Sequence, residues 1–213
     1  DVGEEGHEDF HMSCLNDGRR ILRAQSVMTN DKIIRDTFLM IDPQWRPITA
    51  QMHLIKGDYT GSGTYHFTDD TVSFFGRNRD EGEVSETVSL NTPVTTFGGH
   101  AIQNDAWMYG AFDRFRGDTS DTSLPNTVIT SHASNGGDGP ALTFTDQHHR
   151  YLGEETITTA AGLFDTRKYE FLFEDRPAIQ YWVTGEDYVI VRCRWELLKQ
   201  TYDLVSYTVD SAS

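Results

Sequence analysis

Short segments of alternating apolar and polar residues, separated by brief turns, follow one another through the first ninety residues. Phe10, Met12 and Cys14 alternate in this way before an Asn-Asp-Gly turn at residues 16–18. Alternation of period two places successive side chains on opposite faces of a β-strand, and Asn-Asp-Gly tolerates the positive φ of a tight hairpin. The chain therefore begins as an antiparallel meander. We expect seven strands, near residues 10–14, 21–29, 32–42, 48–58, 59–67, 71–79 and 83–90.

The pattern changes after Pro93. Ile102, Ala106, Tyr109 and Phe112 recur at steps of three and four, which predicts a helix at about 98–115 that its glycines weaken. We interpret residues 118–125 as a polar loop and the Gly-rich residues 135–140 as an exposed one. Strands then return, near residues 127–131, 142–144, 151–158, 167–173, 179–183, 188–195 and 201–209.

About a dozen antiparallel strands do not stay flat, because curling or closure also removes their exposed edges. With no linker or repeat, the sequence indicates one mainly β domain over residues 1–213. We expect a barrel or half-barrel with the helix at or in its mouth. The many aromatic residues suit a lumen that holds a small apolar molecule.

The net charge of −15 excludes some classes of partner. Nucleic acid and anionic lipid both require a basic surface, and the longest apolar runs are too short to span a membrane. A content of 37% hydrophobic residues argues against disorder. We expect a small hydrophobic or aromatic molecule as the partner, and a homodimer remains an open alternative.

Cys14 and Cys193 are the two cysteines. They either bridge two strands or lie as small buried hydrophobes, and we favour buried thiols because disulfide frameworks belong to small secreted domains. No signal peptide is visible, so we expect a cytoplasmic protein, or a periplasmic one if a signal was removed.

The C-terminal third carries Thr-Ala-Ala-Gly-Leu-Phe-Asp at residues 159–165, then a strand at 167–173, Tyr-Trp-Val at 181–183 and Tyr-Asp-Leu at 202–204. Over residues 150–209 this resembles a bacterial family of uncharacterised half-barrel domains with a lipocalin-like shape. The family pattern has Pro-Ala where this chain has Thr-Ala-Ala, and it includes a secretion signal. The resemblance implies a fold and a cavity but no reaction.

His7 and His11 bracket an H-E-x-x-H pattern, which binds zinc when both histidines share one helical face. Here the segment runs into a strand, where the two rings are roughly 13 Å apart, too far for one ion. Phosphate-loop spacing and a Gly-x-Ser-x-Gly elbow are also missing from the sequence. We expect no metal and no cofactor.

Arg77 and Arg79 share a strand face in an acidic protein. They either anchor an anionic substrate group inside the barrel or lie in solvent opposite Glu83 or Glu86. Arg35 lies beside Asp36 in an apolar strand, so at least one of this pair should be buried and paired.

The densest polar and aromatic cluster lies on the predicted helix. His100, Asn104 and Trp107 share one stripe, and Tyr109 follows them. His100 with Asn104 as its orienting partner suits acid/base chemistry, whereas the alternative is a capping histidine on a solvated face. We interpret His53 and His66 as hydrogen-bonded within the protein or exposed, and His132, His148 and His149, in or near loops, as solvated. Tyr59, Tyr65 and Tyr181 either pack or donate to a ligand oxygen.

These residues favour a cofactor-independent acid/base lyase, isomerase or hydratase acting on a small aromatic or apolar substrate. A deformylating or dehydrating lyase on a phenolic, lignin-type compound is one version. We assign His100, Asn104, Tyr59 and Tyr65 to catalysis, and the substrate contacts to Arg77, Arg79, Arg35, Trp107, Tyr109 and Tyr181. The alternatives are a non-catalytic, lipocalin-like carrier and a structural subunit with a filled barrel.

Overall fold

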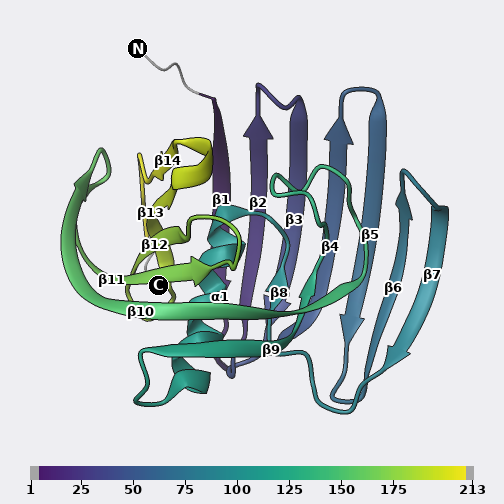
Figure 1. Cartoon of the computed structure of the whole chain (residues 1–213), viewed down its shortest axis with the longest axis horizontal. Coiled ribbons are helices and arrows are strands. Elements are labelled where there is room, and N and C mark those ends of the chain that lie inside the picture. Colours follow the sequence, from purple (N-terminus) through teal and green to yellow (C-terminus); the bar gives the residue numbers. More distant parts are fainter. Residues whose placement is uncertain (1–4, 210–213) are drawn as a thin grey trace.

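Two mainly antiparallel sheets enclose one helix in the computed structural model, which describes residues 5–209 (Figure 1). The fold is mainly β, as the sequence predicts, and one sheet forms a half-barrel. The first sheet is a meander in which each strand pairs with the next. Its strands are β1 (Gly6–Cys14), β2 (Arg20–Met28), β3 (Ile33–Ile41), β4 (Pro47–Lys56), β5 (Tyr59–Phe67), β6 (Thr71–Asn78) and β7 (Gly82–Ser89).

The second sheet has the order β14-β13-β12-β11-β10-β9-β8 and is antiparallel except for the β8–β9 pair. In Figure 1 its long strand β10 curves across the front of the molecule. The helix α1 (Ile102–Arg116) lies between β8 and β9 along the chain, and a short 3-10 helix, Glu196–Leu198, follows β13. The strands are β8 (Phe97–Gly98), β9 (Asp121–Ile129), β10 (Thr143–Thr159), β11 (Gly162–Leu172), β12 (Ile179–Thr184), β13 (Val189–Trp195) and β14 (Gln200–Asp203).

The second sheet departs from the sequence prediction at three strands. The predicted polar loop at 118–125 is largely part of β9, and the predicted strands at 142–144 and 151–158 are one seventeen-residue strand, β10. The gap between these two predictions, residues 145–150, contains no apolar residue, and the pairing with β9 shifts register there between Thr145 and Gln147 without ending. The two-residue strand β8 is too short to leave a pattern.

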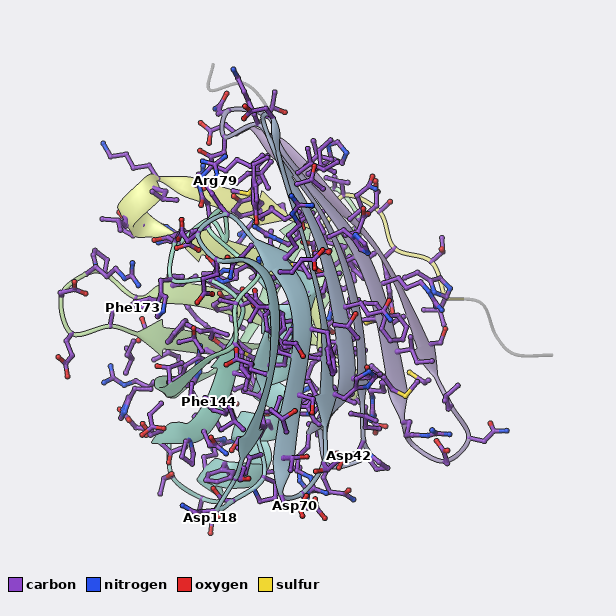
Figure 2. All side chains as sticks on the ribbon, turned by 90° about the vertical axis from the view of Figure 1, so that its right-hand side faces the viewer. Asp42, Asp70, Arg79, Asp118, Phe144 and Phe173 are labelled. Atoms are coloured by element: carbon purple, nitrogen blue, oxygen red, sulfur yellow. The ribbon has the colours of Figure 1, made fainter. Side chains whose placement is uncertain are left out.

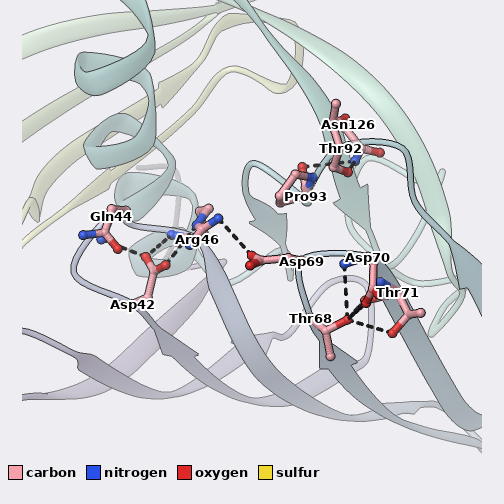
Figure 3. A network of polar contacts seen from close by, with 10 residues as sticks. All are labelled: Asp42, Gln44, Arg46, Thr68, Asp69, Asp70, Thr71, Thr92, Pro93 and Asn126. Atoms are coloured by element: carbon pink, nitrogen blue, oxygen red, sulfur yellow. Dashed lines mark hydrogen bonds and ion pairs between the residues drawn. The ribbon is translucent and has the colours of Figure 1, made fainter.

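The turns at one end of the meander are closed by side chains (Figure 3). Asp42 accepts the backbone N–H groups of Gln44 at 2.7 Å and Arg46 at 2.9 Å, and the Arg46 guanidinium also reaches Asp69 at 3.2 Å. Asn126 donates to the carbonyl of Thr92 at 2.7 Å, which ties the crossover between the sheets to β9.

Side chains fill most of the space between the two sheets (Figure 2). Tyr65 packs against Phe74 and Phe97 at ring-centroid distances of 4.8 and 5.1 Å. Gly110 of α1 lies so close to Trp45 that an added Cβ would be 2.1 Å from its ring, so this glycine permits the helix to approach the meander. The interior is therefore a packed core with a cavity beside it.

Both cysteines are free thiols, but Cys14 is exposed, which corrects the prediction that both are buried. Cys14 lies at the end of the edge strand β1, where the sheet gives it cover on one side only. Within residues 5–209, no helix has the length and apolar character needed to cross a membrane. The same residues contain no cluster of His, Cys, Asp or Glu arranged to hold a metal ion.

Candidate functional site

A cavity of about 640 Å³ opens between the first strands of the meander, the start of α1 and the concave face of the second sheet. Its size falls in the range of small-molecule sites. The walls combine ionisable groups with apolar ones, among them Met28, Met108, Ile129, Phe171 and Ile179.

The meander contributes a polar row to this cavity. Glu8, Ser26 and Arg35 are register partners on β1, β2 and β3, whereas the next partner in the row is the buried Leu54. Because side chains directly opposite one another share a face, the three polar groups meet on the inner side of the sheet. The Ser26 hydroxyl donates to the Glu8 carboxylate at 2.7 Å.

Glu8, on strand β1, also caps the N-terminus of the helix. Its two oxygens accept the backbone N–H groups of Ile102 at 2.8 Å and Gln103 at 2.9 Å. Ala101, the residue before the helix, provides no side-chain cap, so Glu8 supplies the acceptor that the first turn requires. Burial raises the pKa of Glu8, and these three donors oppose that shift.

Arg35 is almost fully buried, at 1% exposure, as the sequence predicts for one of the Arg35–Asp36 pair. It donates to the carbonyl oxygens of His100 at 2.7 Å and Asn135 at 2.5 Å. An added Cβ at Gly136 would be 2.3 Å from the guanidinium, so glycine is required there. Arg35 thereby ties the 131–140 loop and the start of the helix to the meander.

His100 lies in the left-handed region at φ 59°, and its ring Nε2 is 3.3 Å from the Ser131 carbonyl. Burial, and then the charge of Arg35, lower the pKa of His100 to about 4. The imidazole is therefore neutral at neutral pH.

Asp105, in the first turn of α1, is the most perturbed carboxyl group of the cavity. Burial and then the charge of Glu8 raise its pKa to about 8, against the opposing effects of Arg35 and a hydrogen bond with Tyr181. Asp105 is thus largely protonated at neutral pH and able to donate a proton. From the sequence, Asp105 belongs to the polar cluster of the predicted helix but receives no role, although its spacing from Ile102 and Tyr109 places it on the apolar stripe.

The second sheet presents a row of aromatic and thiol side chains to the helix. Its register partners from β10 to β14 are Tyr151, Tyr169, Tyr181, Cys193 and Tyr202. The last three line the cavity, and burial raises the pKa of the Cys193 thiol and of the Tyr181 phenol. Both groups are therefore neutral at neutral pH.

Two loops form the rim. The Arg176 guanidinium lies 4.0 Å from the ring centroid of Phe173 and donates to the Ser134 hydroxyl at 3.2 Å. These contacts join the β11–β12 connection to the 131–140 loop, and His132 lies at the same rim.

Of the predicted site residues, the structure brings Arg35, His100 and Tyr181 to the cavity. Asn104 does not orient the His100 ring; it bonds Gly99 N–H at 2.9 Å and the Phe97 carbonyl at 2.7 Å. Trp107 donates to the Asp187 carbonyl at 3.0 Å, and Tyr109 is stacked on Tyr169 in the core.

The remaining predicted residues lie away from the cavity lining. Tyr65 is buried and donates to the Ala141 carbonyl at 2.8 Å, and Tyr59 donates to the Gly139 carbonyl at 3.2 Å. Arg77 and Arg79 are exposed, with Arg79 over the Tyr59 ring at 4.8 Å. Arg77 is the register partner of Glu83, the solvated arrangement that the sequence analysis left open.

The interpretation of His149 as solvated is wrong. It lies on β10 at 0% exposure, stacked on Phe171 with ring centroids 4.8 Å apart. The sequence interpretation took residues 148–149 as part of a loop, so the inward face of this long strand was missed.

Comparison with known proteins supports the fold but does not indicate an activity. No protein-family model matches the sequence, and neither does any curated protein. A DUF1089 family protein from Pseudomonas aeruginosa superposes with a TM-score of 0.52 at 12% identity, covering 89% of each chain. A β-barrel-like DUF1849 protein from Brucella abortus gives a TM-score of 0.48 at 7% identity, covering 88% of this chain and 80% of that one. The likeness to the Pseudomonas aeruginosa protein supports the fold alone.

Proposed function

We propose that the cavity is the active site of a cofactor-independent acid/base lyase for a small aromatic or largely apolar substrate. The observation that carries this proposal is Asp105, a carboxyl with a pKa of about 8 in a cavity of about 640 Å³. Strongly perturbed titratable groups in a cleft are typical of sites of proton transfer.

Asp105 and His100 have complementary roles in this proposal. Asp105 carries a proton at neutral pH and acts as the general acid, whereas His100 is neutral and its ring accepts a proton as the general base. After a turnover the imidazolium and the carboxylate restore each other by proton transfer. Arg35 positions His100 by holding its backbone carbonyl at 2.7 Å.

Two lyase reactions need only these groups. In a dehydration, His100 removes a proton from carbon while Asp105 protonates the departing hydroxyl, so water leaves and a double bond forms. In a deformylation, His100 removes the proton of a hydroxymethyl O–H and the adjacent C–C bond breaks to release formaldehyde. The electron pair forms the alkene and expels a neighbouring hydroxyl, which Asp105 protonates to water. Neither reaction changes the net oxidation state.

Turnover of a phenolic 1,2-diarylpropane-1,3-diol tests the proposal, with formaldehyde release and alkene absorbance as the two readouts. Asp105→Asn and His100→Gln should each reduce kcat by at least about a hundredfold. Asp118→Asn, at an exposed position, is the control that should retain activity. Undiminished turnover in Asp105→Asn would remove that residue from the mechanism.

A non-catalytic carrier is the second candidate. It is favoured by the fact that the charges of Glu8 and Arg35 are already satisfied by the protein itself. This candidate predicts that the diol binds stoichiometrically and is recovered unchanged. The same assay, run to long times with mass-spectrometric analysis of the bound fraction, separates it from the enzyme.

A further inference from the structure

The two arginines of the cavity wall are already engaged by the protein. Both terminal nitrogens of Arg35 donate to backbone carbonyls, at 2.7 and 2.5 Å. Arg176 stacks on Phe173 at the rim and donates to Ser134. Recognition of a carboxylate normally uses a guanidinium fork with two free parallel donors. Arg35 therefore presents no such fork, whereas Arg176, held at the rim by its Nη1 bond to Ser134, keeps its Nε without a partner among the described residues.

Charge also disfavours an anionic ligand inside the cavity. The carboxylate of Glu8 lies on the wall, and the protein has a net charge of −15. A cationic ligand has no better partner, because Glu8 already accepts three hydrogen bonds from Ser26, Ile102 and Gln103. Beside Glu8 and Arg35, away from Arg176 at the rim, a charged group of either sign would therefore lose hydration without gaining a free counter-ion.

Four polar atoms of the lining nevertheless have no hydrogen-bond partner among residues 5–209. They are three donors, Trp195 Nε1, Arg35 Nε and Arg176 Nε, and one acceptor, Gln147 Oε1. Arg35 and Gln147 are 1% and 6% exposed, so bulk solvent does not satisfy them. A buried polar group without a partner costs about 1–3 kcal/mol. A ligand hydroxyl can both donate and accept a hydrogen bond, so hydroxyl groups can satisfy the unpartnered donors as well as the unpartnered acceptor.

We infer that the cavity selects an uncharged aromatic ligand bearing hydroxyl groups over a carboxylate or an amine of the same shape. A ligand oxygen accepts from Trp195 Nε1, a ligand hydroxyl donates to Gln147 Oε1, and the aromatic rings pack on Phe171 and Ile179. This inference names the substrate class of the proposed active site and so rests on the proposed function.

Isothermal titration of the full chain with three matched probes tests the inference. The probes are 4-(benzyloxy)benzyl alcohol, 4-(benzyloxy)benzoate and 4-(benzyloxy)benzylamine, which share two rings and differ in charge. The alcohol should bind at least tenfold more tightly than either charged probe. Trp195→Phe and Gln147→Met should each weaken binding of the alcohol by about three- to tenfold, which corresponds to one lost hydrogen bond.

Trp182→Phe is the matched control. Its indole donates to Glu155 at 2.9 Å, outside the cavity, so binding of the alcohol should not change. Equal or tighter binding of the benzoate or the amine would overturn the inference and leave the proposed active site standing, as would unchanged affinity in both cavity variants. Failure of all three probes to bind would contradict the inference and the proposed function together. Binding in the predicted order with no turnover of the diol would contradict only the enzyme.

Discussion

The Glu8 carboxylate on the first strand accepts the backbone N–H of Gln103 in the first turn of the helix, at 2.9 Å. A second oxygen accepts the neighbouring N–H of Ile102. This contact joins the edge of the meander to the only α-helix of residues 5–209, and it places a carboxylate beside Asp105. One side chain thus supports both the fold and the electrostatics of the cavity.

Glu8→Ala should lower the free energy of unfolding by about 1–2 kcal/mol, because it leaves two helix N–H groups without their acceptor. Urea unfolding measures this change. The exposed neighbour Asp9→Ala is the control, and equal effects of the two substitutions would mean that the cap does not stabilise the helix.

Asp105→Asn should change how stability depends on pH. The pKa of Asp105 is about 8 in the folded protein against an ordinary value of 3.8, so the folded state holds a proton that the unfolded chain loses. Its stabilising contribution is fully present below about pH 4 and is lost as the pH rises through 8. The variant should therefore be the more stable protein at pH 9, by about 2 kcal/mol. Urea unfolding midpoints are measured at pH 6 and pH 9 for Asp105→Asn and for the control Asp118→Asn. The same change in midpoint between the two pH values in both variants would exclude this effect.

His149→Phe should stabilise the protein, most strongly in acid. Neither ring nitrogen of His149 has a hydrogen-bond partner among the described residues, and burial lowers its pKa to about 3. Below about pH 6.5, His149 is therefore protonated in the unfolded chain but stays neutral in the folded protein. The free energy of unfolding consequently falls as the pH drops from 6.5 toward 3. Melting temperatures at pH 7 and pH 5 should converge in the variant, whereas the exposed His53→Phe should keep the wild-type difference.

The Asp113 carboxylate, near the C-terminal end of the helix, contacts four donor groups. Tyr169 and Tyr188 donate their hydroxyls at 2.6 and 2.7 Å, and the guanidinium groups of Arg167 and Arg116 lie at 3.1 and 2.7 Å. Asp113→Ala should cost about 3 kcal/mol or more, since buried donors lose a shared acceptor. Asp113→Asn, which retains one acceptor oxygen, should cost less. A loss below about 0.5 kcal/mol for the alanine variant would show that the cluster is solvated.

Local sequence patterns predicted the meander well, because its strands are separated by turns and each carries its own alternation. The helix was predicted at 98–115 and lies at 102–116, since apolar spacing marks its buried face. The length of β10 was missed because residues 145–150 contain no apolar residue, while the pairing with β9 continues through a register shift between Thr145 and Gln147.

The candidate site was only partly predictable, for a physical reason. Arg35 could be identified as buried from its own apolar strand. Glu8 acts as a cap only because it contacts a helix some ninety-five positions away in the sequence. The pKa of Asp105 in turn depends on the charge of Glu8 and on the hydrogen bond with Tyr181. Conversely, Arg77 shares a strand face with Arg79, but which face turns outward is decided by how the whole sheet curls.

The most direct test of the proposed chemistry is the protonation state of Asp105. A pH titration of its side-chain carboxyl ¹³C resonance, assigned by comparison with Asp105→Asn, measures this in the intact protein. The proposal predicts an inflection near pH 8, so that the group is a neutral acid at neutral pH. An inflection near pH 4 would contradict it, because Asp105 would then carry no proton to donate.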